Sequence, residues 1–317
     1  MSRLLGEIFY WVFNMSIVAS FCVCFMLVLR RCRLLPNRCI AFLWVIPMLR
    51  FVSFAGLQSK YSLMSLMNKL ANRQIVRPVN FAPFQISAPP VLVENISATN
   101  IVQGASIYFP ITYKVNVLEG VFAVAGVIWI IVGLALLLCF GILYYITMQE
   151  LRESERLYGN VYMSNRVDAP SIYGVIKPRI ILPAVMAQED HTYILLHESE
   201  HIRRGDNLWR VIAFAICAVH WFNPFAWIFL KCYLSDIELA CDETVLRKCT
   251  KEQRKEYARA LLRCAEKKNA FTSAFGGARI RVRIQHILSY RELSFGSALI
   301  FILFSTVILY TLLTNAI

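Results

Sequence analysis

The sequence predicts a mainly α-helical, multi-pass membrane protein with a cytoplasmic-side catalytic domain that contains a small β-sheet. Of the 317 residues, 58% are hydrophobic. Three stretches, residues 8–29, 121–148 and 299–317, carry no charged side chain, and each is near or beyond the roughly 20 residues that a helix needs to cross hydrocarbon. Between the last two stretches lies the run His197-Glu198-Ser199-Glu200-His201, which has the spacing of a metal-binding helix.

We expect about four transmembrane helices. A further apolar stretch, residues 40–56, is interrupted only by Arg50. The first helix is expected to be an anchor, because its apolar run exceeds the roughly 7–15 residues of a signal-peptide core. The predicted parts are transmembrane helices one and two with a short cytoplasmic link (1–57), an extracytoplasmic loop (58–117), transmembrane helix three (118–148), a cytoplasmic domain with the histidine motif (149–293) and transmembrane helix four (294–317).

Basic residues next to the apolar stretches orient these helices. Four arginines follow the first helix (Arg30, Arg31, Arg33 and Arg38), and four precede the last one (Arg279, Arg281, Arg283 and Arg291). Cytoplasmic loops of membrane proteins carry an excess of Lys and Arg, so both groups belong in the cytoplasm. We therefore expect a plasma-membrane protein with both termini outside and residues 149–293 inside.

The formal net charge of +13 does not indicate direct binding to nucleic acid. Much of the excess flanks the apolar stretches, where it orients helices and meets anionic lipid, and no recognition helix or aromatic-basic pattern stands out. The partner that this charge predicts is the lipid bilayer. The ten cysteines are scattered, with no C-x-x-C pair and none in the external loop, so we expect free thiols.

Strands are predicted just before the histidine motif. We expect the third transmembrane helix to continue through Arg156 and to end at Gly159, followed by strands over residues 161–167 and 175–182. An exposed strand edge beside a metal-binding helix can bind an extended peptide as a further strand. A sheet that only packs over the helix is an equally weighted alternative.

Residues 208–230 form a second apolar stretch within the catalytic domain. We expect a membrane-associated helical hairpin that turns at residues 221–224, since Pro224 cannot continue a helix and Asn223 suits a turn. A single crossing would put the histidine motif and the following acidic helix on opposite faces of the membrane. A buried helix pair of a soluble domain is the alternative.

The histidine motif and the acidic helix together predict zinc-dependent peptide hydrolysis. His197 and His201 lie one turn apart on one helix face, so both imidazoles reach one Zn²⁺, while Glu198 is placed to accept a proton from metal-bound water. A catalytic zinc takes three protein ligands. We assign Glu238 as the third ligand, and Asp242, one turn later, as the acceptor that fixes the tautomer of a ligand histidine.

For other polar residues near these residues, a role in metal binding or catalysis is less strongly indicated. Glu243 points elsewhere on the predicted helix and is expected to be a solvated charge. Cys241 is a conceivable metal ligand, but a cysteine in such a position is more often part of a packed core. The sequence singles out no donor for the oxyanion of the reaction, although the side chains of His220, Tyr233 and Tyr257 are candidates.

Four blocks, residues 173–183, 197–206, 220–224 and 238–243, resemble the BlaR/MecR antirepressor family of membrane zinc metallopeptidases, which are gluzincins. The resemblance implies two histidines and one glutamate on zinc, with the first glutamate of the motif as general base. It also implies that an external signal crosses the membrane, that the protease cuts itself, and that a winged-helix transcriptional repressor is its substrate. We place the self-cleavage segment at residues 270–283, with a flexible linker as the alternative.

One departure from this family concerns the sensor. Its best-known members carry an external penicillin-binding domain after the last span, whereas this sequence ends at Ile317 and contains no S-x-x-K motif. We therefore expect no β-lactam recognition by this polypeptide; the external loop or a partner would sense the signal, or sensing has been lost. A non-enzymatic membrane receptor and a housekeeping membrane protease are the alternative functions, and a homodimer is left open.

Overall fold

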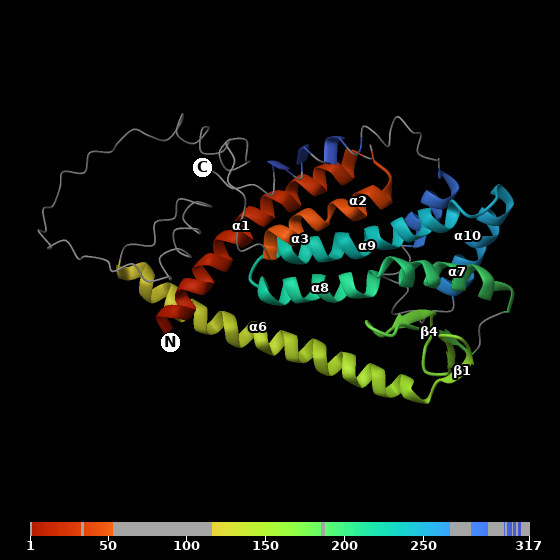
Figure 1. Cartoon of the computed structure of the whole chain (residues 1–317), viewed down its shortest axis with the longest axis horizontal. Coiled ribbons are helices and arrows are strands. Elements are labelled where there is room, and N and C mark those ends of the chain that lie inside the picture. Colours follow the sequence, from red (N-terminus) through yellow and green to blue (C-terminus); the bar gives the residue numbers. More distant parts are fainter. Residues whose placement is uncertain are drawn as a thin grey trace, which may run out of the picture. The chain divides into compact units, whose positions relative to one another are not determined.

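The computed structural model describes residues 2–32, 35–52, 116–184, 188–266, 280–290 and parts of 301–311 (Figure 1). The chain divides into two compact units. The first comprises residues 1–22, 46–131 and 303–317, and the second comprises residues 23–45 and 132–302. The predicted external loop, most of the last predicted span and most of the predicted self-cleavage segment lie outside the described residues.

The first unit contains parts of three helices: α1 (Ser2–Cys32), α3 (Val45–Val52) and α6 (Asn116–Glu150). Its close approach of α1 and α6 depends on glycine, because a Cβ added to Gly126 would lie 2.7 Å from the carbonyl oxygen of Leu5. Beside this contact, the rings of Tyr10 and Phe122 meet edge-on, with centroids 5.2 Å apart. Small residues of this kind let apolar helices pack closely inside a membrane as well as outside it.

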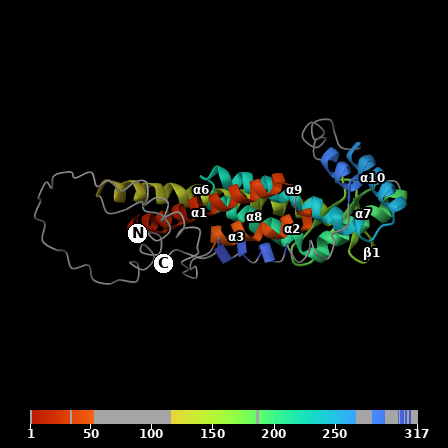
Figure 2. The same cartoon turned by 90° about the horizontal axis from the view of Figure 1, so that it is seen from above.

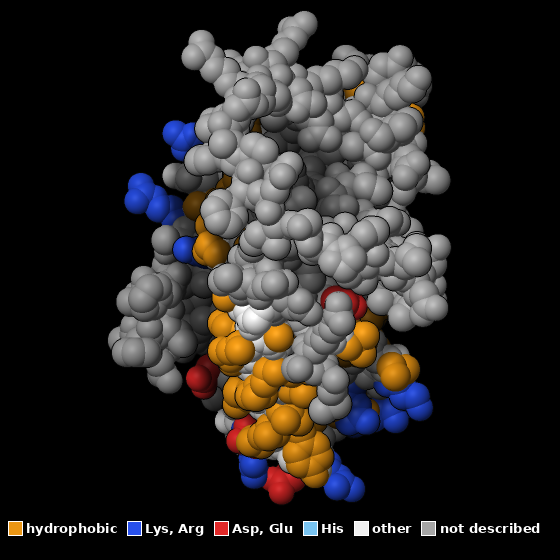
Figure 3. Space-filling model, turned by 90° about the vertical axis from the view of Figure 1, so that its left-hand side faces the viewer, with side chains coloured by type: hydrophobic (Ala, Val, Ile, Leu, Met, Phe, Trp, Pro, Cys, Tyr) orange, Lys and Arg blue, Asp and Glu red, His pale blue; other side chains and the backbone are white. Residues whose placement is uncertain are grey.

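Two described segments are long and apolar enough to cross a membrane, Leu4–Arg31 and Gly120–Glu153. Along α6, apolar side chains remain open to the surroundings, among them Val124 at 63% and Leu138 at 65% exposure. Figure 3 shows hydrophobic side chains gathered on one face, with charged side chains at its margin. Two of the predicted spans are thus helices of spanning length, while the number of crossings and their orientation remain predictions.

The second unit is a helical domain that contains α2 (Asn37–Leu43), α7 (Gln188–Arg204), α8 (Asp206–Val219), α9 (Pro224–Leu246), α10 (Lys251–Glu266) and a helix over residues 280–288. Helix α9 contacts α2, α7 and α8, and the last two of these also contact each other (Figures 1 and 2). The connection from α7 to α8 is the single residue Gly205, whose φ of 69° is one that glycine adopts without strain.

The hairpin predicted over residues 208–230 is confirmed as a helix–turn–helix. Helix α8 ends at Val219, and α9 starts at Pro224, whose missing N–H costs nothing at the first helical position. The Asn223 side chain accepts a hydrogen bond from the backbone N–H of Phe225 at 2.9 Å, which caps the new helix. Whether this hairpin enters the membrane stays a prediction.

The predicted pair of strands is part of a four-stranded sheet. The strands are β1 (Glu155–Tyr158), β2 (Val161–Ser164), β3 (Ser171–Tyr173) and β4 (Arg179–Pro183). Their order is β1-β2-β4-β3, with β2 and β4 parallel and the two outer pairs antiparallel. Strand β3 therefore lies at an edge of the sheet, and it contacts α7.

The expectation that the third transmembrane helix continues through Arg156 is wrong. Helix α6 ends at Glu150, and a short 3₁₀ turn, Leu151–Glu153, leads directly into β1. The physical reason is a tight β1–β2 hairpin at Gly159, which has a φ of 51°. A glycine with positive φ followed by asparagine favours a two-residue hairpin turn, and the hairpin requires strand on both sides.

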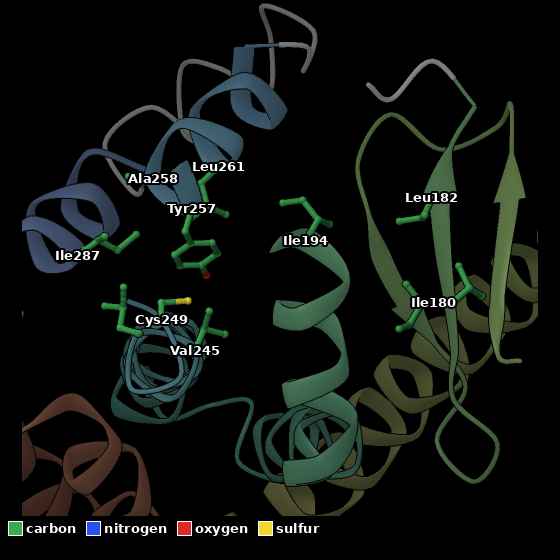
Figure 4. Close-up of a cluster of buried hydrophobic side chains, with 11 residues drawn as sticks. Ile180, Leu182, Ile194, Val245, Cys249, Tyr257, Ala258, Leu261 and Ile287 are labelled. Atoms are coloured by element: carbon green, nitrogen blue, oxygen red, sulfur yellow. The ribbon is translucent and has the colours of Figure 1, made fainter. Parts of the chain in front are cut away.

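A hydrophobic core joins the sheet to the helices of the second unit (Figure 4). Its buried members come from every layer of this part: Val161, Ile180 and Leu182 from the sheet, Ile194 from α7, Val245 and Leu246 from α9, Cys249 from the following turn, Tyr257, Ala258 and Leu261 from α10, and Ile287 from the helix 280–288. This core holds α7 and α9 against each other, and these two helices carry the predicted metal ligands.

Candidate metal centre

The two motif histidines meet through their Nε2 atoms. His197 and His201 lie one turn apart on α7, their side chains are almost completely buried, and the two Nε2 atoms are 3.1 Å apart. Their ring planes are nearly perpendicular, at 88°. Two ligands of a tetrahedral ion with Zn–N bonds of about 2.05 Å would be roughly 3.3 Å apart. The spacing of the two nitrogens therefore fits a shared metal ion.

The opposite nitrogens of both rings are held by partners. Nδ1 of His201 lies 2.6 Å from Oδ2 of Asp206. Nδ1 of His197 lies 2.8 Å from the Tyr257 hydroxyl, which donates its proton to Oδ1 of Asp242 at 2.5 Å. The hydroxyl oxygen of Tyr257 is then the acceptor for an Nδ1–H of His197. With both Nδ1 atoms as donors, the neutral rings turn two Nε2 lone pairs toward one point, as metal-binding histidines do.

Glu238 completes the predicted ligand set from α9. One carboxylate oxygen lies 3.5 Å from Nε2 of His197 and the other lies 3.5 Å from Nε2 of His201. Arg210 of α8 donates to Oε1 of Glu238 at 2.6 Å and orients the carboxylate. Two imidazole lone pairs and a carboxylate converge here, so the residues present fit a divalent cation such as zinc.

Positive charge is favoured in this pocket. Burial would lower the pKa of His197, but the neighbouring Cys241 and Glu238 outweigh it and raise that pKa to about 9. Burial would also raise the pKa of the Glu238 carboxyl, whereas His197 and His201 hold it well below its usual range. Protons on the histidines therefore compete with a metal ion for the same nitrogens.

Cys241 is fully buried, as the sequence favoured, and it also lies beside the two motif histidines. Its thiol is buried and donates to the backbone carbonyl of His197 at 3.3 Å. The candidate ligand atoms of His197, His201 and Cys241 all lie within 4.8 Å of one another. Burial raises the pKa of this thiol, but the charge of His197 outweighs it, and the net effect is a lowered pKa.

The acceptor role predicted for Asp242 is divided between two aspartates. Asp206 binds its histidine directly, whereas Asp242 reaches His197 mainly through Tyr257, with its own Oδ1 3.4 Å from Nδ1. The general base predicted for the reaction, Glu198, is half-buried on α7 beside His197. Its role remains a prediction.

The expectation that Glu243 is a solvated charge is wrong. Its carboxylate is buried and accepts hydrogen bonds from the backbone N–H groups of Asn37, at 2.9 Å, and Arg38, at 3.1 Å. The reason is that α2 begins at Asn37, and the first turn of a helix offers N–H groups with no partner of their own. Two turns earlier on α9, Asp236 accepts from Arg30 at 2.9 Å.

Glu200, inside the histidine motif, is held by two ion pairs. Its carboxylate is buried and forms ion pairs with Lys248, just after α9, and with Arg203, whose Nε lies 2.8 Å away. This carboxylate ties the metal-binding turn of α7 to the end of α9, so its contribution is structural.

Sequence reasoning missed several residues that the structure brings to the centre: Asp206, Arg210 and Arg283. Asp206 closes one of the sequence blocks noted above, which was the only available signal. Of the oxyanion candidates, Tyr257 contacts Nδ1 of His197, the side of the ring that faces away from His201, and so positions that ring. His220 lies in the turn before α9.

Comparisons with known proteins identify a family for this chain. The family model described as BlaR1 peptidase M56 matches residues 10–288. The regulatory protein BlaR1 of Bacillus licheniformis is 28% identical over 141 residues, which are 43% of this chain and 24% of that protein. The methicillin resistance mecR1 proteins of Staphylococcus aureus (strain Mu50) and Staphylococcus epidermidis are 28% identical over 106 residues, 32% of this chain and 18% of each relative. The chain thus matches less than a quarter of the length of these relatives.

Proposed function

Because the chain belongs to the BlaR1 peptidase M56 family, we propose that it is a membrane zinc endopeptidase that hydrolyses peptide bonds in response to an external signal. The observation that carries this proposal is the convergence of three predicted ligand groups, from the buried His197 and His201 and the partly exposed Glu238. Its imidazole and carboxylate donors are those of catalytic zinc sites.

The residues of the pocket can perform amide hydrolysis. Bound zinc would supply a Lewis acid for the scissile carbonyl and lower the pKa of the attacking water. Glu198 accepts the proton of that water and passes it to the leaving amine. Asp206 and Tyr257 keep the ligand histidines in the required tautomer, as their distances of 2.6 and 2.8 Å support.

An extended peptide is the substrate form that the sheet favours. The edge strand β3 contacts α7, so a peptide that pairs with β3 would run along the metal-binding helix. Main-chain pairing of this kind aligns a substrate without requiring a particular sequence. The proposed substrates are the protein itself, within residues 270–283, and a cytoplasmic winged-helix repressor, the class that the family resemblance implies.

The test of this function is zinc-dependent cleavage in reconstituted membranes. Wild-type protein should release a C-terminal fragment of itself or cut a co-encoded repressor, and Glu198→Ala should stop this while zinc content and unfolding temperature stay unchanged. Ser199→Ala, at the exposed neighbouring position, is the matched control and should cleave normally. Unchanged cleavage by Glu198→Ala would refute the proposal. Wild-type signalling by a zinc-free His197→Ala protein would favour a non-enzymatic receptor.

A further inference from the structure

A guanidinium group with no part in the proposed mechanism reaches the metal centre. Arg283, on the helix 280–288, places Nη2 at 3.3 Å from Nε2 of His197 and Nη1 at 3.5 Å from Oε2 of Glu238. Its side chain is 17% exposed. From the sequence, this residue is one of the arginines that orient the last span and the end of the predicted self-cleavage segment. The structure sets it beside two predicted metal ligands.

Asp242 fixes the guanidinium in a two-pronged ion pair. Nε of Arg283 donates to Oδ2 at 2.8 Å and Nη2 donates to Oδ1 at 2.7 Å. The Asp242 side chain is 1% exposed, so this pair is shielded from water. Bidentate pairs are strong and directional, and they restrict the plane of the guanidinium.

The helix that carries Arg283 is anchored on the same face. Ile287, one turn later, packs into the hydrophobic core near Val245 and Tyr257 (Figure 4). His286, three residues after Arg283, places Nδ1 at 3.0 Å from Nδ2 of Asn37. Residues at i, i+3 and i+4 share one face of a helix, so these two contacts aim Arg283 at the metal centre.

The position of Arg283 demands an explanation beyond neutralising Asp242. A guanidinium has five N–H donors, and Asp242 uses two of them. Nη1 and the second N–H of Nη2 remain on the side of Glu238 and His197. The carboxylates of Asp242 and Glu238 already offset the charge of Arg283. Once a metal ion takes the Nε2 lone pair of His197, however, the N–H of Nη2 that faces this nitrogen needs another acceptor.

Such an acceptor develops on the substrate. When water attacks the scissile amide, an O–C bond forms, the carbonyl π electrons move to oxygen, and the proton of the water passes to Glu198. The C–N bond then breaks, and Glu198 returns the proton to the leaving amine. We propose, on the basis of the function proposed above, that Arg283 donates hydrogen bonds to this carbonyl oxygen as it becomes negative. Arg283 keeps its own protons throughout.

The experiment uses the full-length, zinc-loaded protein with Arg283→Gln and Arg283→Lys, and with Arg259→Gln, an exposed arginine of α10 outside the proposed self-cleavage segment, as the control. Three quantities are measured: zinc content, the rate of self-cleavage, and the Kd of a dipeptide phosphoramidate, whose tetrahedral anion resembles the intermediate. Removing one oxyanion donor typically lowers kcat about 10²–10³-fold. We expect that loss for Arg283→Gln, a comparable loss of inhibitor affinity, normal zinc content, and a smaller loss for Arg283→Lys.

Each outcome decides between the alternatives. Wild-type inhibitor affinity in zinc-loaded Arg283→Gln overturns the assignment. If Arg283→Gln loses its zinc or its fold, Arg283→Lys decides, and wild-type affinity in that variant also overturns it. If the wild-type protein cleaves nothing, the proposed function fails, and the inhibitor measurement still shows whether Arg283 contacts a tetrahedral anion.

Discussion

At the scale of single residues, the candidate centre depends on the hydrogen-bond acceptors that hold the two histidine rings in place. A metal-binding imidazole almost always donates its Nδ1–H to an acceptor that favours the required tautomer, and here the acceptors are Asp206 and Tyr257. The two acceptors differ. His201 contacts the carboxylate of Asp206 directly, whereas His197 contacts the Tyr257 hydroxyl, which in turn donates to Asp242. Replacement of Asp206, which contacts its histidine directly, is therefore the more specific test of zinc binding.

We expect Asp206→Ala to weaken zinc binding about 10–100-fold, the loss typical of removing the acceptor of a ligand histidine. The free Nδ1–H of His201 would no longer fix the tautomer that presents Nε2. Competition with a chromophoric chelator measures the Kd. Asp168→Ala, in the loop between β2 and β3, is the control and should bind zinc normally; normal binding by Asp206→Ala would contradict the assigned role.

Zinc affinity should rise with pH. Because the pKa of His197 is raised to about 9 in the metal-free pocket, zinc must displace a proton from this residue at any lower pH. The affinity should therefore increase from pH 6 to pH 9, and the raised pKa of His201 adds to this increase. Isothermal titrations in buffers of different ionisation enthalpy would report the protons released. A flat profile below pH 8 would show that the histidines are already neutral.

At the scale of the elements, α9 carries carboxylates on two faces that contact different parts of the chain. One face carries Glu238 and Asp242 toward the histidines, and the other carries Asp236 and Glu243 toward α1 and α2. An element that contacts α1 and α2 on one face and the candidate metal centre on the other could transmit a displacement from one to the other.

Glu243→Gln should test the second face. A neutral amide keeps an acceptor for one N–H of α2 but removes the charge that favours a helix N-terminus. We expect a loss of stability of about 1–3 kcal/mol, the range for a buried donor that loses its partner. Chemical unfolding in detergent measures it. Glu256→Gln, on the exposed surface of α10, should change stability by less than the error, and an equal effect there would refute the assignment.

The elements also show what the sequence could and could not predict. His197, His201 and the α8–α9 turn follow from local spacing and from proline chemistry, so they were accessible. Strand β3, of three residues, is too short to show a periodicity, and β1 begins within residues that the sequence predicts as the end of the preceding helix. The contacts of Arg283 with His197 and of Arg30 with Asp236 join residues 86 and 206 positions apart, and no local pattern encodes such pairs.

At the scale of the whole molecule, a metal centre that joins α7 to α9 should contribute to the stability of the folded chain. The ligands come together only in the folded state, so bound zinc stabilises that state by mass action. At a free zinc concentration of 100 times the Kd, this contribution is about 2.7 kcal/mol. Removal of zinc by a chelator should therefore lower the unfolding temperature of the entire protein by several degrees.

The comparison that isolates this effect uses two variants under the same conditions. His197→Ala removes a predicted ligand and should abolish the shift on chelation, because it has no bound metal to lose. Glu198→Ala removes only the predicted base and should keep the shift, since its side chain is not a predicted ligand. Differential scanning fluorimetry with and without chelator measures both. An undiminished chelator effect in His197→Ala would mean that the stabilising metal binds elsewhere, and the centre on α7 and α9 would then be wrong as the zinc site.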